Sequence, residues 1–260
     1  MLNVRQTSLA VVSQSPRRSL ALMEGARHYA VALGAGAFKP RTVGDLVRAI
    51  AVAAPRAARA SARGGRESST GTSTRRDIPV AIACAARDGV DEVAVACAEF
   101  GVIRTLHADQ DADERRGVLA ACARSARRGA FDDSCDDEGP VDDDDDDDTA
   151  GDGDARCVCV VTTDACLPSA ANGEASLGFP LLVNYDVPRT KEAYARRARV
   201  ALGGGGRGGG VGVVVTLIVA DDETSSLREV CGDREVETMP VDVLEEVAQG
   251  WFRRANGPDA

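Results

Sequence analysis

The chain has 260 residues, a net charge of −10, a hydrophobic content of 44% and only 3% aromatic residues. This length suits one domain with insertions and a full core made mostly of Val, Ala and Leu. The negative charge is local, because residues 131–155 hold fourteen acidic residues and neither Lys nor Arg. Setting those fourteen charges aside leaves about +4 for the rest, so a polyanionic partner is not excluded.

The use of cysteine and the length of the apolar runs indicate the cellular compartment of the protein. Eight Cys occur without a C-x-x-C pair, and only two His accompany them, which argues against a zinc site. Neither a signal peptide nor an apolar run of about 18 residues is present. We therefore expect reduced cysteines, no membrane partner and an intracellular protein of the cytoplasm or nucleus.

The first quarter of the chain predicts a strand and a helix after an irregular segment at residues 1–25. Residues 27–33 are typical of a strand. Residues 42–54 have helical spacing, with a start at Arg41 or Thr42 and an end at Pro55. Residues 56–77 carry six Arg against two acids without periodicity, which predicts a disordered insertion. A solvated loop and an arm that binds RNA or acidic partners both fit this segment.

The rest of the chain alternates between apolar runs and amphipathic segments. The expected strands are residues 78–84, 102–106, 158–161, 181–183 and 211–219. The expected helices are residues 89–100, 111–128, 190–202, 222–230 and 241–252. This alternation predicts an α/β fold with a doubly wound parallel sheet and helices on both faces. The domain is then residues 26–252, with a tail at 253–260.

Two low-complexity tracts interrupt this pattern. The acidic residues 131–155 predict a second disordered insertion. A solvated loop, a nucleic-acid mimic that covers a basic face, and a weak cation site all remain open. The glycine tract at 203–210 follows a helix and precedes a strand, whereas a phosphate loop needs the reverse order. It predicts a linker.

Polar clusters follow two of the buried runs. Val158–Val161 leads into Thr162, Thr163 and Asp164, and Leu181–Val183 leads into residues 184–186. Ligands of parallel sheets bind outside the carboxyl ends of the strands, so this edge is the expected working face. His107 beside Asp109 has no nucleophile at a supporting spacing, which favours a structural or polymer-contact role over catalysis.

Several motifs together resemble the second, C-terminal RecA-like lobe of DEAD-box RNA helicases, over about residues 20–250. The closest group is that of translation initiation factor 4A. The matching segments are Thr162–Asp164 (T-T-D), Val183–Pro188 (V-N-Y-D-V-P), Lys191-Glu192-x-Tyr194, Leu106–Asp109 for M-H-G-D, Glu114-Arg115 for the end of Q-x-x-R, and Glu237–Val243 for E-E-M-P-x-N-V. Weaker matches are Phe38-Lys39 to Leu46, and Cys84 with Val90-Asp91.

The resemblance implies a P-loop NTPase-type lobe that binds the RNA backbone and supplies half of an ATP site. The implied RNA-binding residues are His107, Asp109, Arg115, Thr162, Thr163, Asp164 and Arg196. The other half of the ATP site belongs to a first lobe with a phosphate loop and D-E-A-D, which this sequence lacks. The chain alone is therefore expected to use no cofactor, and to use ATP and Mg only if paired with such a lobe.

The family's catalytic motifs are degenerate here. The segment Ala165–Ser169 stands in place of A-R-G-x-D. Arg197 falls on the first arginine finger and Val200 on the second, while Arg196 replaces a His. An arginine finger accounts for about 10³–10⁵ in the rate of nucleotide hydrolysis. Arg197 is then a remnant finger, and the chain alone is expected to be inactive as an ATPase, a pseudoenzyme.

Three functions remain open from the sequence. The first is a degenerate lobe that binds the RNA backbone weakly, or a helicase, translation or RNA-processing partner, without hydrolysis of its own. The second is a fragment, or a truncated gene product, of an ATP-dependent RNA helicase. The third is a protein-interaction scaffold with no RNA affinity.

Overall fold

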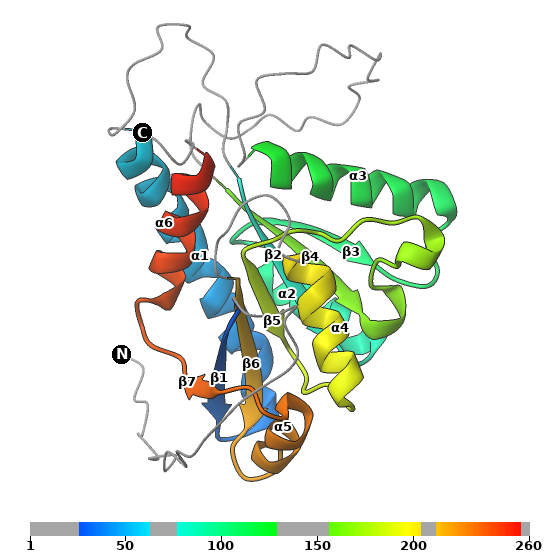
Figure 1. The fold of residues 1–260 in the computed structure, drawn as a ribbon, viewed down its shortest axis with the longest axis vertical. Helices are drawn as coiled ribbons and strands as arrows, with labels where there is room; N and C mark the ends of the chain where they lie inside the picture. Colours follow the sequence, from blue (N-terminus) through cyan, green and yellow to red (C-terminus); the bar gives the residue numbers. More distant parts are fainter. Residues whose placement is uncertain (1–25, 63–76, 129–155, 204–211, 256–260) are drawn as a thin grey trace, which may run out of the picture.

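The computed structural model describes residues 26–62, 77–128, 156–203 and 212–255 (Figure 1). The predicted acidic insertion, the glycine tract from residue 204 and the N-terminal segment 1–25 lie outside the described residues, as does most of the predicted insertion at 56–77. Within the described ranges, no helix combines the length and the apolar character needed to cross a membrane.

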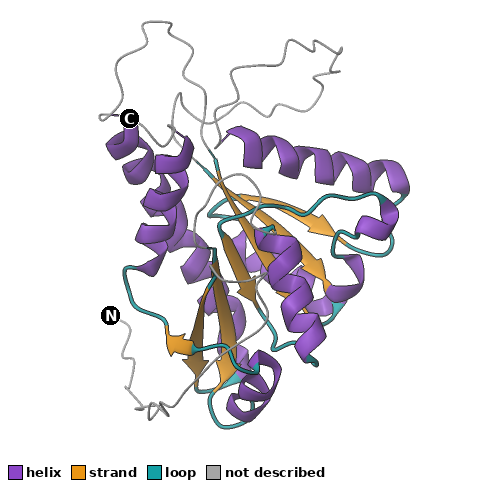
Figure 2. Cartoon of the chain, viewed as in Figure 1, coloured by secondary structure: helices purple, strands orange, loops and turns teal. Residues whose placement is uncertain are grey.

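A single parallel sheet forms the centre of the described chain (Figure 2). Its strand order is β3-β4-β2-β5-β6-β1-β7, and every neighbouring pair is parallel. The strands are β1 (Arg27–Leu33), β2 (Ile78–Cys84), β3 (Val102–Leu106), β4 (Cys157–Thr163), β5 (Leu181–Asn184), β6 (Val213–Val219) and β7 (Val236–Thr238). The predicted α/β fold with a parallel sheet is confirmed.

Helices cover both faces of this sheet, as expected for parallel strands. On one face lie α1 (Lys39–Ala62), α2 (Arg87–Cys97) and α6 (Val243–Ala255), with α1 and α6 side by side (Figure 1). On the other lie α3 (Ala112–Arg128), α4 (Lys191–Leu202) and α5 (Thr224–Cys231). Strand residues alternate between the two layers: Val80 and Ile82 of β2 pack with the first set, and Ala81 and Ala83 with the second.

Helix α1 corrects the prediction that Pro55 ends the helix. It begins at Lys39, directly after a 3₁₀ turn η1 (Gly36–Phe38), and continues through Pro55 to Ala62. Proline removes one helical hydrogen bond, but the turns around it are held by packing. Ala57 is buried in the core, and the Ser61 hydroxyl donates to the Phe252 carbonyl of α6 at 2.9 Å. Tertiary contact with α6 therefore overrides the local helix breaker.

Two smaller differences concern the C-terminal region. Strand β7 was not expected, because three residues give no readable alternation; it pairs with β1 through His28 and Val236. Helix α6 extends to Ala255, so the tail begins later than residue 253.

Candidate functional site at the carboxyl edge of the sheet

The carboxyl ends of the central strands lie in register at one edge of the sheet. Cys84 of β2 pairs with Thr163 of β4, and Ala83 pairs with Asn184 of β5. The short turn η2 (Asp164–Cys166) follows β4 directly, and η3 (Ala170–Asn172) follows it. The two polar clusters found in the sequence are thus brought to the same edge.

Arg197 of α4 is the centre of this edge. Its side chain is fully buried, and its guanidinium forms a two-pronged ion pair with Asp164, at 2.6 Å from Nε and 2.7 Å from Nη2. Nη1 donates to the Asn184 side chain at 3.2 Å and to the Asp186 carbonyl at 2.8 Å. A buried guanidinium needs such partners, because an unpaired buried charge is strongly destabilising.

Further buried polar groups lie under α4. The Asn184 amide donates to the Thr216 hydroxyl of β6 at 3.1 Å. Also on α4, the Tyr194 hydroxyl lies 2.8 Å from His28 Nδ1 on β1. Burial raises the pKa of Tyr194, and lowers that of His28 to about 4, so both side chains are neutral at pH 7. These polar contacts hold α4, and with it Arg197, against the sheet.

Lys39 forms a second buried charge cluster at the same edge. Its ammonium lies 3.0 Å from Glu223 Oε1 and 3.3 Å from Asp186 Oδ1. The second oxygen of Asp186 accepts from the Ala85 amide at 2.9 Å, and the second oxygen of Glu223 accepts from the Val219 amide at 2.8 Å. One lysine from α1 therefore ties together the loops after β2, β5 and β6.

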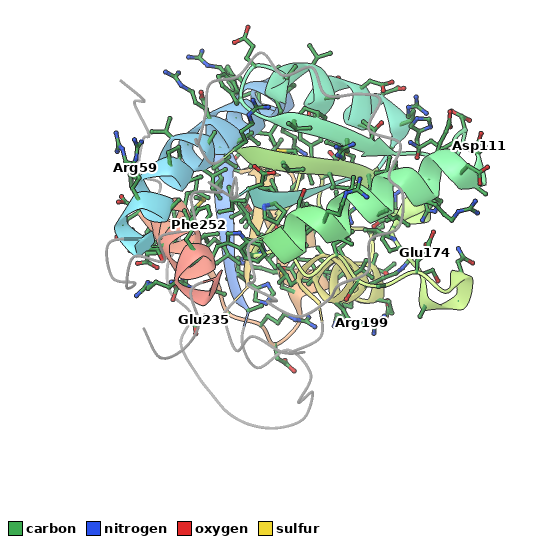
Figure 3. The ribbon with its side chains drawn as sticks, turned by 90° about the horizontal axis from the view of Figure 1, so that it is seen from above. Arg59, Asp111, Glu174, Arg199, Glu235 and Phe252 are labelled. Atoms are coloured by element: carbon green, nitrogen blue, oxygen red, sulfur yellow. The ribbon has the colours of Figure 1, made fainter. Side chains whose placement is uncertain are left out.

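Two more arginines bind the loop that follows β4. Arg115 of α3 donates to both oxygens of Glu174, at 2.5 and 2.9 Å, and to the Cys166 carbonyl at 3.1 Å. Figure 3 shows Glu174 in this loop beside α3. Arg196 donates to the Asp164 carbonyl at 3.0 Å and to the Leu167 carbonyl at 3.4 Å. The three arginines singled out in the sequence therefore all contact the segment 164–174.

The remaining candidates differ in how accessible they are. Thr162 is buried and its hydroxyl donates to the Thr163 carbonyl at 3.2 Å, while Thr163 itself is half-buried. His107 follows β3, and its Nδ1 is buried without a hydrogen bond, 3.9 Å from an Asp109 oxygen. Asp109 is 80% exposed and pairs with Arg87 at 2.8 Å. These two residues lie beside the arginine-bound loop and do not join its hydrogen bonds.

A shallow depression opens beside Arg197. It has a volume of about 220 Å³ and is lined by Ala85, Asp164, Val187, Arg189, Ala193 and Arg197. Arg189 is exposed and positive at its rim. Burial raises the pKa of the nearby Cys84 thiol to about 12, so this cysteine is no nucleophile at neutral pH. The described residues hold no group of three or more metal-ligating side chains.

Sequence reasoning missed Glu174, the partner of Arg115, and the charge cluster around Lys39. Glu174 stands in an irregular loop and carries no motif, and Lys39 was noted only within a weak match. Both are found only once the loops are placed in space, because ion pairs between segments far apart in sequence leave no local pattern.

Comparison with solved structures gives the same fold class as the motifs. S. cerevisiae Dbp5 bound to RNA and ADP BeF3 is similar at a TM-score of 0.50 and 14% identity, over 87% of this chain and 45% of that one. The C-terminal domain of the DEAD-box protein Dbp5 gives 0.49 and 15%, over 86% and 95%. E. coli DEAD-box protein SrmB bound to regulator of ribonuclease activity A gives 0.46 and 15%, over 84% and 93%.

The likeness to Dbp5 at a TM-score of 0.50 supports the fold and no more. The described chain has an α/β RecA-like fold, and it spans less than half of that Dbp5 chain. No protein-family model matches the sequence, and no curated protein matches it.

Proposed function

We propose that this chain is a RecA-like lobe that binds the phosphate backbone of RNA, or a helicase partner, without hydrolysing ATP itself. The absence of ATP hydrolysis is inferred from the burial of Arg197. A residue that stabilises a transferred phosphoryl group must reach it, and this guanidinium makes four hydrogen bonds inside the chain. Together with Val200 at the second finger position, this supports the absence of turnover.

RNA affinity is supported by cations that remain exposed near the working edge. Arg189 and Lys191 are exposed just before and at the start of α4, which follows β5 at this edge, and Thr163 at the end of β4 is half-buried. Contacts of this kind to phosphates give affinity without reading sequence, and the affinity falls as salt rises. The RNA and ADP BeF3 named for Dbp5 belong to that protein, and they motivate the choice of ligand here.

The first test is a fluorescence-anisotropy titration of a labelled single-stranded RNA at low and moderate salt. We expect weak binding at low salt that is reduced in a chain with Arg189 and Lys191 both replaced by Ala. A matched control replaces two exposed arginines of the opposite face, Arg48 and Arg253. A shared loss in both chains, or no binding at low salt, contradicts specific backbone contact at this edge.

The second test is ATP hydrolysis by the purified chain. No activity above buffer is expected with or without RNA. Hydrolysis that persists through purification and disappears in an Arg197→Lys chain of unchanged thermal stability contradicts the proposal.

Two alternatives each have a test of their own. A fragment of an ATP-dependent helicase, with ATP and Mg bound between two lobes, is supported by the partial coverage of Dbp5. Sequencing the full transcript tests it, since a first lobe with a phosphate loop and D-E-A-D must then be found. A scaffold without RNA affinity is indicated if no RNA binds at low salt.

The match of Glu237–Val243 supports a place near the initiation factor 4A group, and hence a partner in translation.

A further inference from the structure

The carboxylate of Glu174 is bound like an anionic ligand. Arg115 donates from Nε at 2.5 Å and from Nη2 at 2.9 Å, and the backbone amide of Ser169 donates at 3.0 Å. The two side chains are only 20% and 14% exposed. A guanidinium fork and a backbone N–H that converge on two oxygens form a donor set that suits a phosphate equally well.

We propose that Glu174 is a tethered substitute for phosphate, which occupies an anion site that an RNA phosphate takes when Glu174 is displaced. The inference rests on the proposed RNA-backbone function, and it adds the regulation of that site. In the resting chain the site is filled from within, so RNA binds only the fraction of molecules in which Glu174 has left it.

The guanidinium of the site and its occupant lie on different elements. Arg115 lies on helix α3 and keeps its bond to the Cys166 carbonyl when Glu174 leaves. Glu174 follows Gly173, which has a left-handed φ of 72° and no neighbouring atom within 4 Å of a Cβ position. Residues 170–173 and 175–176 on either side of Glu174 are exposed. A rotation of the Glu174 side chain, with its backbone amide still bonded to the Ser169 carbonyl at 3.1 Å, therefore moves the carboxylate without disturbing the sheet.

Charge favours both the resting state and the exchange. The hydrogen bond from Arg115 lowers the pKa of Glu174, so the carboxylate is ionised at neutral pH and holds the site. Because it is tethered, it competes at a high effective concentration. An RNA strand competes through several phosphates at once, each of which adds a salt-dependent contact.

The test compares Glu174→Gln with the wild-type chain by anisotropy on labelled oligouridine at low salt. The substitution keeps the shape and removes the charge, and the affinity is expected to rise about tenfold. Adding Arg115→Ala to Glu174→Gln should abolish the gain. If that double variant fails to fold, Arg115→Lys replaces it, because lysine keeps the charge and loses the fork.

Glu192→Gln is the matched control, since Glu192 is an exposed acid at the start of α4. An equal gain in Glu174→Gln and Glu192→Gln would mean general electrostatics, and it overturns the inference. The inference is also overturned if the wild-type chain binds RNA and Glu174→Gln has the same RNA affinity. The proposed function then still stands. If none of the chains binds RNA, the proposed function itself is wrong, and the inference falls with it.

Discussion

His28 gives a quantitative test of the buried polar contact with Tyr194 beneath α4. It is 7% exposed, and burial, helped by the positive charge of Arg234, lowers its pKa from 6.5 to about 4. The unfolded chain titrates near 6.5, so between pH 6.5 and 4 the unfolded state binds more protons than the folded one. Stability that is fully present above pH 6.5 is therefore lost as the pH falls through this window.

The magnitude follows from the two pKa values. The gap between 6.5 and about 4 corresponds to roughly 3 kcal/mol in all, of which about 2 kcal/mol is lost between pH 7 and pH 5. His28→Gln does not titrate and keeps a polar group next to the Tyr194 hydroxyl. The free energy of unfolding of the wild-type chain is expected to fall by about 2 kcal/mol more than that of His28→Gln.

Urea denaturation at pH 7, 6 and 5, followed by circular dichroism, measures this difference. Carboxylates titrate in both chains, so their contribution cancels in the comparison. The difference should grow steadily from pH 7 to pH 5. Parallel losses in the two chains would show that His28 is not held neutral in the fold, and would refute the reasoning.

Three further predictions concern charge and helix structure. Asp164→Ala leaves the Arg197 guanidinium buried without its carboxylate, and should lower the free energy of unfolding by about 3–5 kcal/mol in urea; Asp109→Ala, at an 80% exposed site, should change it by less than about 0.5 kcal/mol. Pro55→Ala restores a backbone donor within α1 and should stabilise the chain by up to about 3 kcal/mol, whereas a loss would show that the proline ring itself is needed in the packing. Deleting residues 132–154 removes fourteen negative charges and should raise RNA affinity at low salt, so an unchanged anisotropy curve would mean that this tract does not compete with RNA.

The order of the strands and helices was readable from the sequence because the burial of parallel strands leaves continuous apolar runs. Ile78–Cys84 and Val213–Val219 are examples, and the structure places both inside the sheet. The polar residues after β4 and β5 were likewise placed correctly at one edge, since parallel strands bring their carboxyl ends together.

What the sequence did not reveal were the directions of the side chains and the effects of long-range packing. From the sequence, Arg115 and Arg197 were interpreted as contacts for a ligand. In the structure they bind carboxylates of the chain itself that lie 59 and 33 residues away in the sequence. Pro55 read as a helix end, because its local effect was visible and the compensating contact with α6 was not.

The position of β1 has a consequence for synthesis of the chain. Arg27 pairs with Val213, and on its other side β1 pairs with β7, so the first strand has no partner until the last third of the chain exists. At about 5–20 residues per second, this interval lasts roughly 10–40 s. Strands β2 to β5 form their own ladders in the meantime. An apolar strand with two open edges is thus exposed on the nascent chain, and a chaperone or the ribosome surface is expected to shield β1 until β6 emerges.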